Sequence, residues 1–313
     1  TEYLRLTPDD ASNEFDGCGA AVADGGPPPI GPPGGAPLGT SPAAALIGPF
    51  VVAVVGRPFE QNGPGSAYLF DGFSGVQLAK LEPPAGTLPG SLFGFSVATA
   101  DGLTYVGSPG EGPNPFRGPG AVHIYNNATG TRIESITPFD GDEFDFFGGS
   151  LAVDNGTLFV GATGSGGEGA VYLYDALTAS FRGRLTITSD DFGVEFGSSI
   201  DVDAGRLLVG SPSEFVGPGE AYVYDVATQT ETLRIDYPLG DDFDFFGGRV
   251  ALAGPIAAVS DWTDGMNAGA VSLVDVETGE LLRVLRPDPP LAGNSFGFGL
   301  AANDGLLAVG NTV

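Results

Sequence analysis

A unit of about fifty residues repeats along most of this chain. Phe-Gly pairs mark the unit and follow one another at intervals of 54, 49, 50 and 50 residues. The pairs begin at Phe93, Phe147, Phe196, Phe246 and Phe296. A fixed period of this size is typical of propellers and related arrays, in which each unit buries its apolar surface against its neighbours. The period therefore restricts the chain to a repeat architecture.

Each unit has the pattern of four short strands. The Phe-Gly pair is followed by an alternating segment such as SLAVD, a tight turn that ends in glycine, and an apolar run such as TLFVG. A third segment ends in an acid or amide that can close an Asx-type turn, at Asp71, Asn126, Asp175, Asp225 and Asp275. A fourth segment lies ten residues further on, at Leu81, Ile136, Leu185, Ile235 and Leu285. No stretch has helical periodicity, so the chain is predicted to be an all-β propeller.

The number of blades follows from the inner-strand units. Six can be counted, starting at Gly17, Gly94, Gly148, Gly197, Gly247 and Gly297. We predict six four-stranded blades in one domain that spans residues 1–313, with seven blades as the alternative if sequence is missing. In the first unit the second strand, PFVVAVVG, is delayed by a Pro/Gly-rich segment at 25–48, which is predicted to be a surface insertion and not a strand.

The two ends of the chain share one blade in this scheme. The opening TEYLRLTP matches the fourth-strand segment ELLRVLRP at 280–287, so we expect the N-terminal strand to close the last blade. That blade then lacks its third strand. Either the sequence is truncated or processed, or another polypeptide supplies the strand.

The repeats FGGSLAVDNGTLFVGA, FGSSIDVDAGRLLVGSP and FGFSVATADGLTYVGSP resemble the FG-GAP repeat of integrin α-subunit propellers and of many secreted bacterial proteins. The resemblance covers nearly the whole chain and implies an extracellular interaction scaffold, with seven blades in the integrin case. Integrin-type repeats often carry a calcium loop of alternating aspartates between their first two strands. The corresponding turns here, VDNG, VDAG, LAGP and ANDG, are too short for such a loop.

Composition excludes several classes of function. The chain has 39 acidic and 12 basic residues, a net charge of -27, which predicts no nucleic-acid partner. No apolar run is long enough for membrane insertion, and no signal peptide opens the chain, so we interpret it as the mature form of an extracellular or cell-surface protein. With a single cysteine, Cys18, and a single histidine, His123, catalytic triads and zinc sites are effectively unavailable. His123 is predicted to be a structural imidazole inside a strand.

Acidic residues gather in the loops that lead into the Phe-Gly pairs. Hard oxygen ligands at close spacing suit Ca²⁺, so calcium is the predicted cofactor, with a solvated rim of turn-capping acids as the alternative. The predicted metal ligands are Asp140, Asp142, Asp145, Asp241, Asp242 and Asp244. Trp262 and Met266 fall in a loop on the same face and are candidates for binding a partner, with local packing of Trp262 as the alternative.

These features favour a non-enzymatic scaffold for adhesion, matrix binding or assembly into a larger structure. The expected partner is a protein or polysaccharide at the cell surface. Self-assembly into a homo-oligomer or filament would use the incomplete last blade or the 25–48 loop. The alternative is a lectin, or a carbohydrate-active enzyme that uses paired carboxylates on the acidic face.

Overall fold

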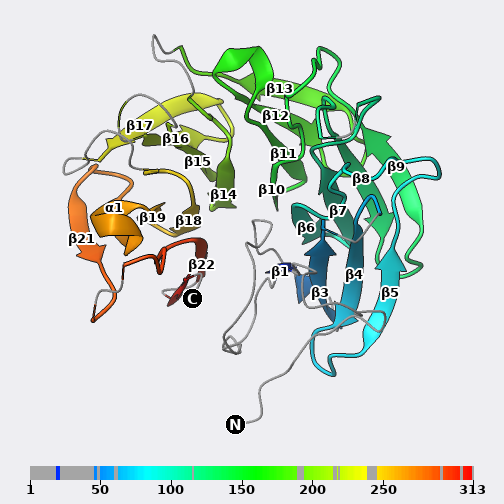
Figure 1. The fold of residues 1–313 in the computed structure, drawn as a ribbon, viewed down its shortest axis with the longest axis horizontal. Coiled ribbons are helices and arrows are strands. Elements are labelled where there is room, and N and C mark those ends of the chain that lie inside the picture. The colour runs from blue at the N-terminus through cyan, green and yellow to red at the C-terminus, as the bar shows by residue number, and fades with distance from the viewer. Residues whose placement is uncertain are drawn as a thin grey trace. The chain divides into compact units, whose positions relative to one another are not determined.

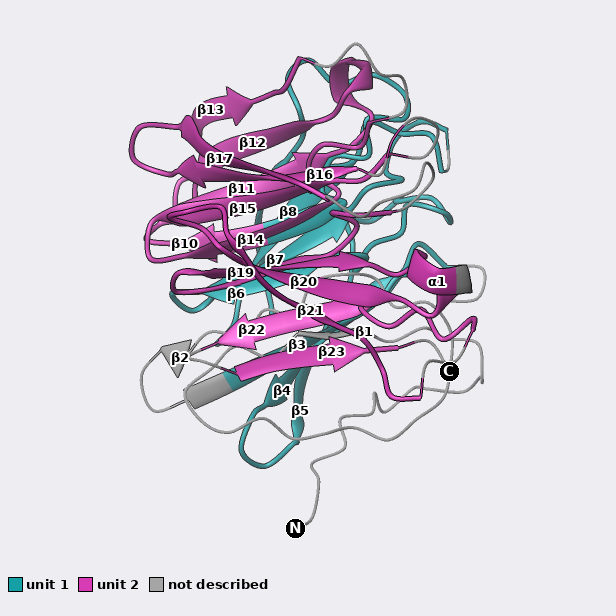
Figure 2. Cartoon of the chain, turned by 90° about the vertical axis from the view of Figure 1, so that its left-hand side faces the viewer, with its two compact units in different colours: residues 1–151 teal, residues 152–313 magenta. Residues whose placement is uncertain are grey.

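The computed structural model describes residues 19–21, 46–47, 50–59, 63–114, 116–188, 194–213, 217, 219–237, 245–289, 292–303 and 306–311. Two compact units divide the chain, residues 1–151 and residues 152–313 (Figure 2). The boundary between them falls within one strand, β10 (Ser150–Asp154). None of the helices in the described parts has the length and apolarity needed to span a membrane.

The first unit contains two antiparallel sheets that follow one another along the chain (Figure 1). The strands of the first sheet are β1 (Gly19–Ala21), β3 (Phe50–Arg57), β4 (Ser66–Asp71) and β5 (Gln77–Leu81), with β2 (Leu46–Ile47) paired to β3. The strands of the second sheet are β6 (Val97–Ala100), β7 (Leu103–Ser108), β8 (Ala121–Asn126) and β9 (Arg132–Ile136). In both sheets the strand order along the sheet follows the chain, so each sheet is a meander of the kind expected for one blade.

The same meander recurs through the remainder of the chain. One sheet holds β10, β11 (Thr157–Ala162), β12 (Ala170–Asp175) and β13 (Phe181–Leu185). The next holds β14 (Ser199–Asp203), β15 (Arg206–Ser211), β16 (Glu220–Asp225) and β17 (Thr230–Asp236). The next holds β18 (Val250–Ala253), β19 (Ile256–Asp261), β20 (Ala270–Asp275) and β21 (Leu281–Leu285), and β22 (Gly299–Asn303) pairs with β23 (Leu306–Gly310). Two single turns, η1 (Ser165–Gly167) and α1 (Asp264–Asn267), follow the second strands of their sheets.

The strand predictions are confirmed for the described residues, including the split first unit. β1 pairs with β3 across the insertion, with Ala21 opposite Val54. One expectation was wrong, because Leu46 and Ile47 within the predicted insertion form the short strand β2 against Phe50 and Val51. The N-terminal strand expected to close the last blade, and most of segment 25–48, lie outside the described residues. The choice between six and seven blades stays a prediction.

The Phe-Gly pairs join successive sheets. Phe93, Phe147 and Phe196 are fully buried, and each donates its N–H to a carbonyl just before the third strand of the preceding sheet, at 2.8 to 2.9 Å. The glycine that precedes each third strand has a positive φ, and a Cβ atom there would overlap the carbonyl oxygen of the Phe. These glycines are Gly65, Gly120, Gly169, Gly219 and Gly269. Only glycine permits both the backbone angle and the close approach.

The predicted Asx turns are confirmed at the third-strand ends. In four of them a side-chain oxygen of the strand's last residue accepts the N–H groups of the residues two and three positions on, as in Asp71 with Phe73 and Ser74. The hydroxyl and N–H of Ser74 hold the pKa of Asp71 below its usual value. The N–H and hydroxyl of Thr178 lower the pKa of Asp175 to about 2. These carboxylates are therefore ionised and committed to the turns.

In the second unit, two neighbouring sheets share an apolar core and a polar ladder. Leu208, Val223, Phe246 and Val259 pack in the core between β14–β17 and β18–β21. Side chains on alternate residues of β14 also accept N–H groups from alternate residues of β18 and from the glycine that follows it. The pairs are Ser199 Oγ with Val250 (3.1 Å), Asp201 Oδ2 with Leu252 (2.7 Å) and Asp203 Oδ2 with Gly254 (2.6 Å). Burial raises the pKa of Asp201 to about 7.

Candidate functional site

Of the predicted metal ligands, Asp145 uses its carboxylate within its own loop. Asp145 is 4% exposed, and its Oδ2 accepts the N–H of Asp142 at 2.9 Å. The N–H of Asp145 in turn donates to the carbonyl of Asp142 at 3.3 Å. Among the described residues no group of three or more His, Cys, Asp or Glu side chains is placed to hold a metal ion. A calcium site at Asp140, Asp142 and Asp145 stays a prediction. The second predicted set, Asp241, Asp242 and Asp244, lies outside the described residues, so for these residues the calcium site stays a prediction.

Trp262 lies in a cluster of aromatic rings and one arginine. Its ring stacks on Phe245 at 5.5 Å between centroids and meets Phe298 edge-on at 5.4 Å. The guanidinium of Arg249 lies 5.1 Å from the Trp262 ring and 5.2 Å from the Phe298 ring. Burial lowers the pKa of Arg249 to about 10. The structure thus shows the local packing given above as the alternative, and a partner-binding role for Trp262 and Met266 stays a prediction.

His123 has the structural role predicted for it. The imidazole is buried on β8, and its Nε2 lies 2.8 Å from Oε2 of Glu111 while its Nδ1 lies 2.8 Å from Oγ of Ser135. Burial tends to raise the pKa of Glu111, but the hydrogen bond and the charge interaction with His123 outweigh burial and hold that pKa below its usual value. Both ring nitrogens are therefore committed to neighbours in the same sheet region.

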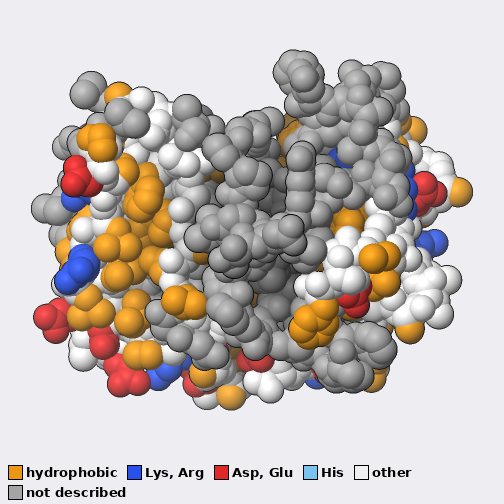
Figure 3. Space-filling view, turned by 90° about the horizontal axis from the view of Figure 1, so that it is seen from below, with side chains coloured by type: hydrophobic (Ala, Val, Ile, Leu, Met, Phe, Trp, Pro, Cys, Tyr) orange, Lys and Arg blue, Asp and Glu red, His pale blue; other side chains and the backbone are white. Residues whose placement is uncertain are grey.

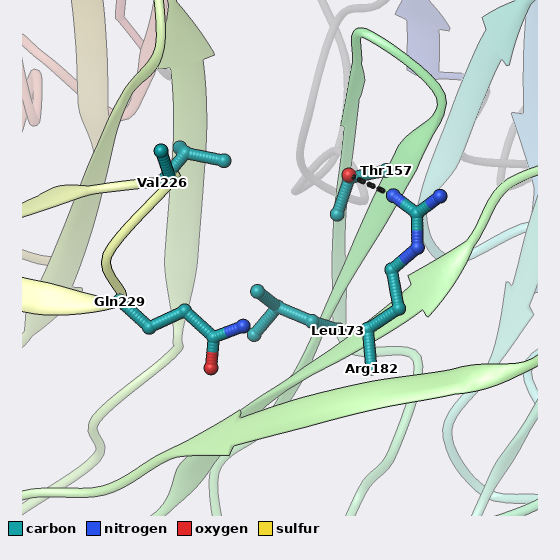
Figure 4. A pocket seen from close by; sticks show the side chains of 6 residues that line it. Thr157, Leu173, Arg182, Val226 and Gln229 are labelled. Carbon is teal, nitrogen blue, oxygen red and sulfur yellow. Dashed lines mark hydrogen bonds between the residues drawn. The ribbon is translucent and has the colours of Figure 1, made fainter.

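An open groove of about 440 Å³ lies in the second unit (Figure 4). Its lining residues are Thr157, Leu173, Arg182, Val226, Ala227 and Gln229. Arg182 donates from Nη1 to Oγ1 of Thr157 at 2.5 Å and from Nη2 to Oδ2 of Asp175 at 2.6 Å. Gln229 comes from the turn between β16 and β17, and Figure 4 shows its amide reaching toward Leu173. The groove therefore joins an apolar floor to hydroxyl, guanidinium and amide groups.

The groove was not predicted from the sequence, although the repeat contains a signal for it. At two junctions a residue near the middle of a fourth strand faces a turn glycine of the next sheet: a Cβ at Gly130 would lie 3.0 Å from Ala79, and one at Gly279 would lie 3.1 Å from Leu233. Between β13 and the β16–β17 turn the residue types are exchanged. The strand has Gly183 and the turn has Gln229, whose amide covers the glycine.

A second hollow, of about 390 Å³, lies beside α1. It is lined by Asp264 and Arg286, among others, and these two side chains form an ion pair at 2.7 Å. Because each charged group already has its partner, this hollow presents little unpaired polarity. It lies in the loop region of Trp262 and Met266, and the side chain of Met266 is outside the described part of the chain.

The chain resembles known proteins in fold and in repeat. The crystal structure of BamB from Moraxella catarrhalis, a β-propeller, superposes with a TM-score of 0.50 and 16% sequence identity over 83% of this chain and 67% of that chain. No curated protein matches the sequence. The structural likeness defines the class of the protein as a β-propeller. Residues 131–174 match the model of the FG-GAP repeat, so the β-propeller contains a segment similar to that repeat.

Proposed function

We propose that this propeller is a non-enzymatic scaffold that binds protein partners outside the cell or at its surface. The observation that carries the proposal is the use of the reactive side chains within the fold. Asp145 closes its own loop, both nitrogens of His123 are engaged, and the carboxylates at the third-strand ends cap turns. The FG-GAP repeat supports an interaction role. Because these side chains are used within the fold, we assign the function to binding of partners at the protein surface.

Exposed apolar side chains supply contact area for a protein partner. Phe73 is 73% exposed and Leu177 is 78% exposed, each two residues after the aspartate of its Asx turn. Figure 3 shows apolar side chains reaching the surface next to acidic and basic ones. The net charge of -27 favours partners with basic surfaces.

Binding assays on the whole chain test this proposal. We expect saturable binding to basic extracellular or surface proteins that weakens as salt rises, because opposite charges steer the association. The same chain is incubated with a panel of polysaccharides. Turnover that disappears in the Asp142→Asn variant would overturn the scaffold proposal in favour of a carboxylate-based enzyme.

Self-assembly is part of the proposal and has its own observation. The sheet of β22 and β23 has two strands among the described residues, whereas the other sheets have at least four. A strand from a second copy that adds to the outer edge of β23 would extend this sheet. Sedimentation of the chain across a range of concentrations should then show oligomers. Unchanged assembly after deletion of residues 27–45 would exclude the insertion as the contact, and a strict monomer would exclude both contacts.

A further inference from the structure

We propose that the groove lined by Thr157, Leu173, Arg182, Val226, Ala227 and Gln229, called here the Gln229 groove, binds an extended peptide segment of a partner protein. The segment would place an aliphatic side chain on the floor of the groove and a basic side chain beside it. This inference rests on the proposed scaffold function and gives it a site and a ligand class.

The junction between Gly183 and Gln229 reverses the residue types found between Leu233 and Gly279. Where Leu233 meets Gly279, an aliphatic side chain on the strand fills the space over a glycine in the turn. At the Gln229 groove the strand contributes Gly183, and the turn contributes a long polar side chain. A primary amide thus stands where the other junction has hydrocarbon. About 440 Å³ of open space remains, within the range of ligand pockets.

Gln229 has a left-handed backbone conformation. Its φ is 55°, in the left-handed region, at the turn position where Gly75, Gly130 and Gly279 have φ values of 65° to 74°. A residue with a Cβ is disfavoured there relative to glycine. Within the described part of the chain the side-chain amide makes no hydrogen bond that would offset this strain. Ala179 has nearly the same φ, 56°, at the equivalent position of the preceding repeat, so the backbone angle belongs to the repeat. The feature particular to Gln229 is its side-chain amide, whose donors and acceptor stay available at the groove.

The chemistry of the lining groups indicates a peptide. A primary amide offers one acceptor and two donors, which match the N–H and C=O of an extended backbone. Leu173 is buried beneath the groove and Val226 is half-buried at its side, so the floor accepts an aliphatic side chain. No aromatic ring is among the lining residues, so the groove lacks the stacking platform that favours a sugar.

The charges around the groove favour a particular residue type next to the aliphatic residue of the peptide. The guanidinium of Arg182 is neutralised by Asp175, at 2.6 Å. Asp225, at the start of the turn that carries Gln229, accepts the N–H and the hydroxyl of Thr228 with Oδ1 and has no basic partner among the described residues. These two bonds hold the pKa of Asp225 below its usual value, so it is ionised at neutral pH. Arg182 is the one charged residue in the lining, and it is outnumbered by two carboxylates next to the groove: Asp175, its partner, and Asp225, which precedes the lining residue Val226. This balance favours a lysine or arginine in the peptide.

A peptide array tests the proposal with the full chain. The probes are nonamers with a central leucine or valine flanked by lysine, by serine or by glutamate. We expect retention of the lysine-flanked set and weaker or no binding of the other two. The test variant is the double exchange Gly183→Leu with Gln229→Gly, which copies the Leu233 and Gly279 junction and so uses a pair that this fold already accommodates. It should lose binding by at least about tenfold.

Two further variants separate recognition from folding. Gln229→Ala removes the amide while keeping a residue type that occurs at the equivalent position, Ala179, with φ 56°, and it should also lose binding. Leu88→Ser removes an exposed apolar side chain outside the lining and should bind as the unchanged chain does. Thermal unfolding of every variant is measured alongside, and unchanged midpoints with lost binding support the groove.

Three results would overturn the inference. They are no retention of any nonamer, equal binding by the double exchange, and Gln229-dependent binding of a neutral oligosaccharide instead of peptide. If the double exchange still binds the basic proteins used to test the scaffold function, the groove inference fails and the scaffold function stands. If the unchanged chain binds neither nonamers nor proteins, both fail.

Discussion

Single polar residues determine how neighbouring sheets of the second unit are joined. Asp201 accepts the N–H of Leu252 from the next sheet and the N–H of Val202 from its own strand, at 2.7 and 2.9 Å. Hydrogen bonds of this kind favour the ionised carboxylate, and burial between two sheets opposes ionisation. Burial has the larger effect, and the pKa is raised to about 7 from the ordinary 3.8. The ladder between β14 and β18 therefore contains a carboxyl group that titrates near neutral pH.

The titration of Asp201 should make stability depend on pH. Between about pH 4 and pH 7 the folded protein keeps a proton that the unfolded chain has lost, so the free energy of unfolding falls as pH rises through this window. We expect a loss on the order of 1–2 kcal/mol between pH 5 and pH 8, less than the full shift implies because the side chain is partly exposed. Urea unfolding at the two pH values measures it.

The control for this prediction is Asp201→Asn. The amide cannot ionise, so the difference in unfolding free energy between pH 5 and pH 8 should shrink by the same amount, whatever constant cost the lost acceptor adds. Carboxylates with lowered pKa values, such as Asp175, lose their contribution only as pH falls below the ordinary range, outside this window. An unchanged pH dependence in the variant would assign the effect to another group.

At the scale of strands and turns, the join between sheets depends on backbone contact. A glycine directly precedes the third strand of each sheet, and the next Phe-Gly pair packs against it. Gly169, for example, forms a parallel bridge with Phe196. The Phe side chain then fills the apolar space beyond, where Phe196 contacts Tyr222 and Tyr224 edge-on. Glycine and phenylalanine thus act together, and neither has a substitute of similar geometry.

Two glycines of one loop test this account. Gly167 and Gly169 have φ values of 91° and 90°, but a Cβ at Gly167 would meet nothing within 4 Å, whereas one at Gly169 would overlap the Phe196 carbonyl. Gly167→Ala should therefore cost about 1–2 kcal/mol for backbone strain alone. Gly169→Ala should cost at least about 3 kcal/mol, because the junction must also open. Chemical denaturation measures the loss of stability in each variant. Equal losses would show that the close contact between Gly169 and the Phe196 carbonyl does not contribute.

The sequence predicted what is local to a repeat and missed what depends on distant contacts. Strand positions and Asx turns follow from alternation and from single acids such as Asp71, so both were predicted. β2 was missed because its apolar pair Leu46–Ile47 lies next to a Pro/Gly-rich run, and its pairing with β3 follows from a tight return of the chain. The surroundings of Trp262 include Phe298, from another repeat, and no pattern around Trp262 indicates that contact. Predicting the Gln229 groove would have required comparing the residue types of each fourth strand with those of the facing turn in the next repeat.

At the scale of the whole molecule, electrostatics is dominated by the excess of acid. Four of the described arginines form ion pairs with acids: Arg182 with Asp175, Arg206 with Glu277, Arg234 with Glu220 and Arg286 with Asp264. These pairs are at the surface and individually contribute little. The remaining acids repel one another in the compact state, and this repulsion opposes folding. Added salt should therefore stabilise the folded protein.

The effects of general screening and of specific calcium binding on the unfolding midpoint are distinguished by comparing NaCl and CaCl₂ at equal ionic strength. Raising NaCl from low concentration to about 0.5 M shortens the screening length to a few ångströms and should raise the unfolding midpoint by a few degrees. Screening alone predicts about the same rise with CaCl₂ at the same ionic strength. A larger rise with Ca²⁺ than with matched NaCl, abolished by Asp242→Asn and kept in Asp142→Asn, would instead establish a specific calcium site in the loop that precedes Phe246.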